Sequence, residues 1–212
     1  MVVAGDDRRG VGDGDVDPPI PDGATALRAT ATECWPRALI ASGRAERLAA
    51  YWRTSLAESA AAGLPPFARH AWSERLADAL YEARRARRLV RGLEGAEAQL
   101  ASEAVGLRAR SRATAPGVGE AEGEASRLSR LLVVTEDGAP RFYRAVESLR
   151  RRHAGRLEVL VLACDEVRLG ERLFGRGRRA RAVLIAHKES LVRFGEALWS
   201  GLGEVSDSNR PE

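Results

Sequence analysis

The sequence predicts an α/β fold, specifically a three-layer α/β/α sandwich with a helical N-terminal extension. Strand-like and helix-like segments alternate after residue 129, and the run Leu157–Ala163 is almost entirely apolar. Such a run is typical of a strand that is buried on both faces of a sheet. The chain has 212 residues, of which 44% are hydrophobic. This is enough for one domain with a substantial core and with extensions.

The N-terminal third is expected to contain a tail and an arm. Residues 1–24 combine Gly, Pro and Asp at low hydrophobicity, which predicts a disordered acidic tail. Residues 25–72 are rich in Ala, Leu and Arg and show helical spacing between prolines, which predicts a helical N-terminal arm. Its tryptophans are either anchors for a partner or residues that dock the arm onto the main domain: Trp35, Trp52 and Trp72.

The main domain is expected to span residues 73–203, followed by a disordered tail at 204–212. It begins with a long helical pattern that Ser73 should cap and that a glycine at position 92 should interrupt. The interruption is expected because an internal Gly costs about 1 kcal/mol relative to Ala. Residues 106–128 show no periodicity, which predicts a flexible insertion inside the domain.

The remaining elements alternate regularly. We expect strands at 131–135, 157–163 and 181–186 and helices at 140–152, 166–174 and from about 189 to 199. Glu136 and Asp137 are expected to form a turn and to cap the helix that follows, and Asp165 is expected to cap the helix at 166–174.

The charge distribution favours an anionic partner. The net charge is +4 and the isoelectric point about 9.6, although six Asp face two Arg between Met1 and Thr25. The rest of the chain is therefore more basic than the total suggests. Arginines gather before Gly92 and again between Gly175 and Arg181. The alternative is that these arginines form solvated faces in an Arg-rich chain.

No catalytic or metal-binding pattern is present in the sequence. Cys34 and Cys164 lie far apart, and the three histidines have no matching nucleophile nearby in sequence. We therefore expect reduced cysteines in a protein that is not an enzyme and that has no cofactor or metal site. No apolar run has membrane-spanning length, so we expect no membrane partner and a cytoplasmic location, or a nuclear one as well.

The order of these elements resembles the ribosomal-protein L-seven-Ae/L-thirty-e superfamily, whose members bind kink-turn RNA. The matching pieces are Arg91-Gly92-Leu93 at a helix start, the strand and acidic turn at 132–137, Leu169-Gly170 in a short helix, and the loop and strand from Gly175 to Val183. The similarity covers roughly residues 84–203. Within the superfamily, the run from Arg87 to Leu93 is most similar to the branch of SECIS-binding protein two.

This resemblance implies an RNA-binding surface in which the helix start and the loop before the last strand lie at the same end of the sheet. In the family the helix after the glycine carries an Asn or Arg, then Glu, then Lys one turn later. Those positions are Glu94, Gly95 and Ala98 here. The contacts are therefore supplied differently, or they go mostly to phosphates, or the domain binds protein instead. The residues expected to bind RNA are Arg87, Arg88, Arg91, Gly92, Glu94, Arg176, Arg178, Arg179 and Arg181.

The expected function is recognition of a kink-turn-like structured RNA, most specifically the SECIS element of selenoprotein mRNAs during selenocysteine incorporation. The ribosome or an elongation factor would be a further partner. The alternative is a protein-interaction or RNA-binding subunit of a ribosomal, snoRNP or RNase P-like assembly on the same fold, in which the Trp-containing arm contacts the partner.

Overall fold

The computed structural model describes residues 28–113 and 127–207. The expected acidic tail at 1–24 and the central part of the expected insertion lie outside these residues. The elements are short 3-10 turns (Arg28–Thr30, Thr32–Cys34), helices α1 (Arg37–Ala41), α2 (Ala45–Ala61), α3 (Glu74–Arg85), α4 (Leu93–Ala113), α6 (Pro140–Arg152), α7 (Glu166–Phe174) and α8 (Lys188–Asp207), and strands β1 (Ala68–Ala71), β2 (Leu89–Arg91), β3 (Arg130–Thr135), β4 (Leu157–Ala163) and β5 (Ala182–Ile185).

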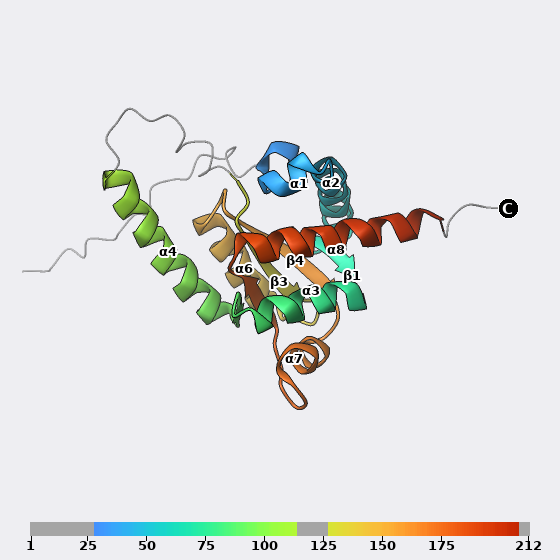
Figure 1. Cartoon of the computed structure of the whole chain (residues 1–212). Helices are drawn as coiled ribbons and strands as arrows, with labels where there is room; N and C mark the ends of the chain where they lie inside the picture. The colour runs from blue at the N-terminus through green and yellow to red at the C-terminus, as the bar shows by residue number, and fades with distance from the viewer. Residues whose placement is uncertain (1–27, 114–126, 208–212) are drawn as a thin grey trace, which may run out of the picture.

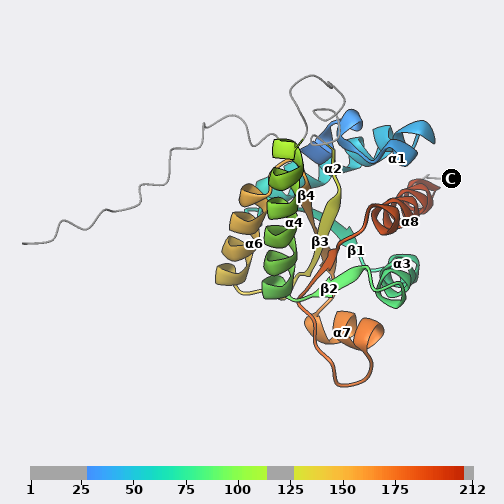
Figure 2. The ribbon, with the colours of Figure 1, turned by 60° about the vertical axis from the view of Figure 1, so that its left-hand side comes forward.

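The five strands form one mixed sheet in the order β1-β4-β3-β5-β2. β1, β4 and β3 are parallel to one another, whereas β5 is antiparallel to both of its neighbours, β3 and β2. Helices cover both faces of the sheet, as Figures 1 and 2 show, and α7 lies beyond one end of it. The predicted α/β/α sandwich is confirmed.

Alternate residues of the central strands pack into two separate hydrophobic cores, one on each face of the sheet. Leu131 and Val133 of β3 pack with α3, α8 and the N-terminal helices, whereas Leu132 and Val134 pack with α4 and α6. Side chains alternate between the two faces of a strand, so a strand that is apolar at every position must be covered on both faces. Figure 2 shows α4 and α6 on one side of the sheet and α3 and α8 on the other.

The N-terminal helices belong to the first of these cores. Trp35 and Trp52 are 1% and 0% exposed and meet edge to face, with ring centroids 5.5 Å apart. The indole N–H of Trp35 donates to the carbonyl of Ala29 at 2.9 Å. Of the two roles considered for these tryptophans, docking of the arm is confirmed, and a role for Trp35 and Trp52 as exposed anchors is wrong.

Two short strands were not expected from the sequence. β1 lies in the segment assigned to the arm and pairs with β4, so the arm and the main domain share one sheet. β2 occupies the expected interruption before Gly92, and it separates α3 from α4. α4 then continues to Ala113 and Leu128 is buried, so both ends of the expected insertion are part of the fold. At the C-terminus, α8 extends to Asp207, into the segment expected to be a disordered tail.

The outer edge of β1 is closed by hydroxyl groups of α2. The Ser59 hydroxyl donates to the Phe67 carbonyl at 3.0 Å, and the Tyr51 hydroxyl donates to the Arg69 carbonyl. The Ser55 hydroxyl accepts from the Arg69 N–H at 2.8 Å and lies 3.1 Å from the Arg69 carbonyl. These bonds satisfy backbone groups that an edge strand would otherwise expose.

Candidate functional site

The residues expected to bind RNA form three groups, at 87–88, 91–94 and 176–181. The structure brings the second and third groups together. The β2–α4 junction meets the loop at residues 175–181, which we call the Arg loop. The Gly92 N–H donates to the Ala182 carbonyl at 2.8 Å, and the Arg91 guanidinium donates to the Arg179 carbonyl. Arg91, Gly92 and the Arg loop therefore form one surface at the end of the sheet where β5 begins.

Arg87 and Arg88 do not lie on this surface. β2 is antiparallel to β5, with Val90 opposite Leu184, so the residues before Val90 lie beside the far end of β5. The Arg88 carbonyl accepts from the Ala186 N–H at 2.9 Å, and the Arg88 guanidinium pairs with Glu189 of α8 at 2.6 Å. The expectation that Arg87, Arg88 and Arg91 join the Arg loop as one cluster is thus wrong for Arg87 and Arg88. The four residue steps from 87 to 91, of which only Leu89–Arg91 is strand, span at most about 13 Å.

Gly170 allows the Arg loop to approach α7 closely. A Cβ at position 170 would lie 2.2 Å from the Arg178 carbonyl oxygen and 2.5 Å from the Arg179 Cα, so no larger residue fits without a backbone shift. The loop is also anchored by the Ala180 N–H, which donates to the Glu166 carbonyl at 2.8 Å. Within the Leu169-Gly170 pair, Gly170 therefore has a physical role, because its lack of a side chain lets the Arg loop pack against α7.

Two glycines and one carboxylate shape the tip of the Arg loop. Gly175 and Gly177 have φ of +96° and +73°, which side chains other than Gly adopt at a cost. The Gly177 N–H donates to the Glu171 side chain at 2.8 Å. This N–H is therefore already occupied, and the glycines serve the turn more than they cradle a phosphate.

The arginines of the loop differ in how they are held. Arg179 and Arg181 each contact a different oxygen of the Glu166 carboxylate, at 3.4 and 2.9 Å. Arg176 and Arg178 are exposed and make no side-chain hydrogen bond or ion pair to another described residue. Two guanidinium groups are thus oriented by the protein, and two are available for an anionic ligand.

Phe174 joins α3, α7 and β2 beneath this surface. The guanidinium carbons of Arg84 and Arg91 lie 5.5 and 5.1 Å from its ring centroid. Such cation–π contacts favour a fixed position for both arginines. Phe174 was not predicted as a site residue, because neither its hydrophobicity nor its spacing distinguishes it from a core residue.

The first turn of α4 offers little for reading bases. Glu94 and Ala98 are exposed, and a Cβ at Gly95 would lie 3.0 Å from a methyl group of Val90. None of these residues has a side-chain donor, and Glu94 carries a negative charge. Glu94 lies in the first turn of the helix that starts after Gly92, as predicted, but its negative charge disfavours contact with a phosphate.

The acidic turn after β3 has a different capping role from the one expected. α6 begins after Ala139, which makes no side-chain cap, so Asp137 does not cap α6. Asp137 instead accepts from the Thr135 hydroxyl at 2.5 Å and from the Glu166 N–H at 3.1 Å, at the start of α7. Asp165 caps the same helix through the Arg168 N–H at 2.7 Å, as predicted. The acidic turn therefore supports the helix that carries the Arg loop.

The other titratable groups of the described residues give no sign of a reactive centre. Cys164 is buried, and burial raises the pKa of its thiol to about 12, which keeps the thiol protonated and unreactive. Cys34 and Cys164 do not form a disulfide. Among residues 28–113 and 127–207, no group of three or more His, Cys, Asp or Glu side chains could hold a metal ion.

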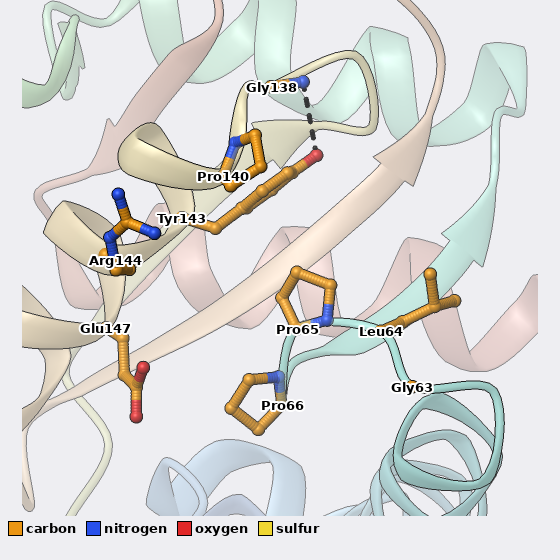
Figure 3. A pocket seen from close by; sticks show the side chains of 9 residues that line it. All are labelled: Gly63, Leu64, Pro65, Pro66, Gly138, Pro140, Tyr143, Arg144 and Glu147. Carbon is orange, nitrogen blue, oxygen red and sulfur yellow. Dashed lines mark hydrogen bonds between the residues drawn. The ribbon is translucent and has the colours of Figure 1, made fainter.

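A hollow of about 420 Å³ lies between the α2–β1 loop and the start of α6, and its lining includes Leu64, Pro65, Pro140 and Tyr143 (Figure 3). The Tyr143 hydroxyl donates to the Thr135 carbonyl at 2.9 Å and accepts from the Gly138 N–H at 3.3 Å. Because this hydroxyl is satisfied on both sides, it fixes the acidic turn and is not available to a ligand.

Comparison with models of known protein families and with curated proteins finds no match to this chain. Within the part of the chain that the structure describes, no helix combines the length and apolar character needed to cross a membrane. The function therefore has to be inferred from the site itself. The site is a basic surface at one end of an α/β/α sandwich, and its loop backbone is held by hydrogen bonds.

Proposed function

We propose that this chain is an RNA-binding protein that grips the phosphate backbone of a structured RNA with the Arg loop and the β2–α4 junction. The observation that carries the proposal is the convergence of five arginines from two distant segments at one end of the sheet. They are Arg91, Arg176, Arg178, Arg179 and Arg181.

The geometry suits a phosphate ligand. A guanidinium group can donate two parallel hydrogen bonds to a phosphate, and arginine can also stack on an unpaired base. The loop backbone is fixed by Gly170, by the Glu166 carbonyl and by the Arg91 side chain. Little backbone order has to be gained on binding, which favours affinity.

The finer proposal is that the RNA contains a kink-turn, as in a SECIS element. It is supported by the family resemblance and by the adjacency of the Gly92 helix start and the Arg loop. Because Gly95 and Ala98 carry no polar side chain, we propose that phosphate contacts and RNA shape contribute more than base reading does.

The second candidate is a protein-interaction subunit of a ribonucleoprotein. Such a subunit would contact its partner through exposed tryptophans of the N-terminal arm. Trp35 and Trp52 are fully buried, and Trp72 is half-buried beneath Arg168, whose guanidinium carbon lies 4.7 Å from the Trp72 ring centroid. The basic surface therefore favours the RNA-binding function.

Binding of a fluorescent kink-turn hairpin at several salt concentrations tests the proposal. Arg178→Ala removes an unpaired guanidinium, so we expect about fivefold weaker binding and a log–log salt slope that is shallower by about 1. Arg179→Ala should act in the same direction. Arg53→Ala, at an exposed position on α2, is the matched control and should change neither quantity.

A second hairpin, in which the sheared G·A pairs are replaced, tests the kink-turn itself. The finer proposal predicts weaker binding to this hairpin at physiological salt. Equal binding to both hairpins at low salt, with loss of both at physiological salt, would leave only nonspecific electrostatic attraction and would contradict the proposed function.

A further inference from the structure

Arg87 has a backbone conformation that is unfavourable for its residue type. Its φ is +57°, and it is the only residue other than Gly with positive φ among those that the structure describes. It follows Ala86, the C-cap of α3, and there the Arg87 N–H donates to the Arg84 carbonyl at 2.9 Å and the Arg88 N–H donates to the Ala83 carbonyl at 2.8 Å. This pair of bonds defines a Schellman motif, in which Gly is the usual residue at this position.

The Arg87 side chain does not compensate for this strain. It is exposed and makes no hydrogen bond or ion pair to another described residue. Its neighbour Arg88 is held by Glu189 at 2.6 Å. Residues with strained backbone conformations often lie at functional sites.

β2 connects Arg87 to the Arg loop along an open sheet edge. Ala186 bonds to Arg88, and Gly92 bonds to Ala182, so the alternate residues Leu89 and Arg91 point their N–H and C=O groups away from β5. These groups have no partner among residues 28–113 and 127–207. The contrast with β1 is direct, because α2 hydroxyls close the outer edge of that strand. Figure 2 shows β2 between α3 and α4.

We infer that the RNA extends beyond the Arg loop along the open edge of β2 to a second phosphate anchor at Arg87. The inference rests on the proposed function. The path is at most about 13 Å long, has guanidinium groups at both ends, and carries the outward N–H donors of Leu89 and Arg91. Arginine side chains and backbone N–H groups are common donors to phosphate oxygens.

The charges on this edge disfavour a second copy of the chain as its occupant. Pairing of two β2 strands would bring Arg87, Arg88 and Arg91 of one copy close to the same residues of the other. Like charges at such separations repel, and among the described residues Arg88 alone of these three arginines has a carboxylate partner, Glu189. A polyanion complements the edge.

Arg87→Gly separates the role of the side chain from that of the backbone. Glycine relieves the strain, so we expect the melting temperature to rise by about 2–4 °C. Affinity for the fluorescent kink-turn hairpin should nevertheless fall about fivefold, and the log–log salt slope should become shallower by about 1. Arg87→Lys keeps a positive charge and should retain most of the affinity.

The outcomes distinguish this inference from the proposed function. If Arg178→Ala weakens binding but Arg87→Gly stabilises the protein without changing its affinity, the second anchor is wrong and the Arg loop stands. If Arg178→Ala has no effect, the proposed function itself fails. If Arg87→Gly weakens binding to a polyglutamate peptide but not to the hairpin, the edge serves a protein partner and the inference is overturned.

Discussion

At the scale of single residues, Gly170 and Arg87 are the positions where residue type matters most for the proposed RNA contacts. Gly170 leaves room for the backbone of the Arg loop, and Arg87 occupies a conformation suited to glycine. The first is a steric requirement of the fold. The backbone conformation of Arg87 is unfavourable, and no contact of its side chain with another described residue offsets this cost.

Gly170→Ala should displace the Arg loop. The added methyl group would lie 2.2 Å from the Arg178 carbonyl oxygen, which is backbone and cannot rotate away. We expect a loss of about 1–3 kcal/mol in the free energy of unfolding, as for other overpacked sites, together with weaker RNA binding. Urea unfolding and hairpin binding measure the two effects.

Gly106→Ala is the matched control for this substitution. Gly106 lies in α4 with open space around it, so alanine should stabilise the helix by about 1 kcal/mol and leave RNA binding unchanged. If Gly170→Ala is as well tolerated as Gly106→Ala, the close approach of the loop to α7 is wrong.

Local capping could be read from the sequence only in part. Ser73 and Asp165 were predicted as helix caps, and both accept the expected backbone N–H. Asp137 was assigned to the wrong helix. Capping by the residue next to a helix follows from local sequence, whereas the reach of Asp137 to the start of α7 depends on the parallel pairing of β3 and β4, which the local sequence does not specify.

At the scale of secondary-structure elements, α4 is held to the sheet by the carboxylate of Glu103. Arg130 and Arg156 donate to it at 2.9 and 2.8 Å, and Gln99 donates at 2.9 Å. Burial alone would raise the pKa of Glu103, but these hydrogen bonds and the positive charge of Arg130 outweigh burial and hold the pKa below its usual value.

This arrangement predicts a pH dependence of stability. Because the pKa of Glu103 is lower in the folded state, its contribution is complete above the unfolded value of about 4.3 and is lost as pH falls through the folded pKa. Urea unfolding of Glu103→Gln should therefore show a smaller loss of stability on acidification than the parent protein. Glu58→Gln, at an exposed position on α2, should behave like the parent, and equal acid sensitivity in both variants would contradict this role.

Long elements were predicted better than short ones. β4 and α6 have the expected boundaries because Leu157–Ala163 is apolar throughout and Pro140 suits the start of a helix. β1 and β2 have four and three residues and include arginines, so neither apolar runs nor alternation identify them. Their strand character comes from pairing with β4 and β5.

At the scale of the whole molecule, the separation of the chain into an arm and a main domain does not describe the core. The N-terminal helices, β1 and α8 pack around the same face of the sheet. The sequence predicted the sandwich, because alternation and burial patterns are local. It could not place Arg87 and Arg88 relative to the Arg loop, because that depends on the direction and register of β2 against β5.

In the proposed mode of binding, the RNA contacts the Arg loop and then extends along β2 to a separate anchor at Arg87. Ultraviolet crosslinking of the bound kink-turn hairpin, followed by mass-spectrometric mapping at physiological salt, tests it most directly. This mode of binding predicts crosslinks within residues 175–181 and 87–92, with weaker crosslinking of the first set in Arg178→Ala. Crosslinks confined to another surface, such as the exposed face of α6, would contradict it.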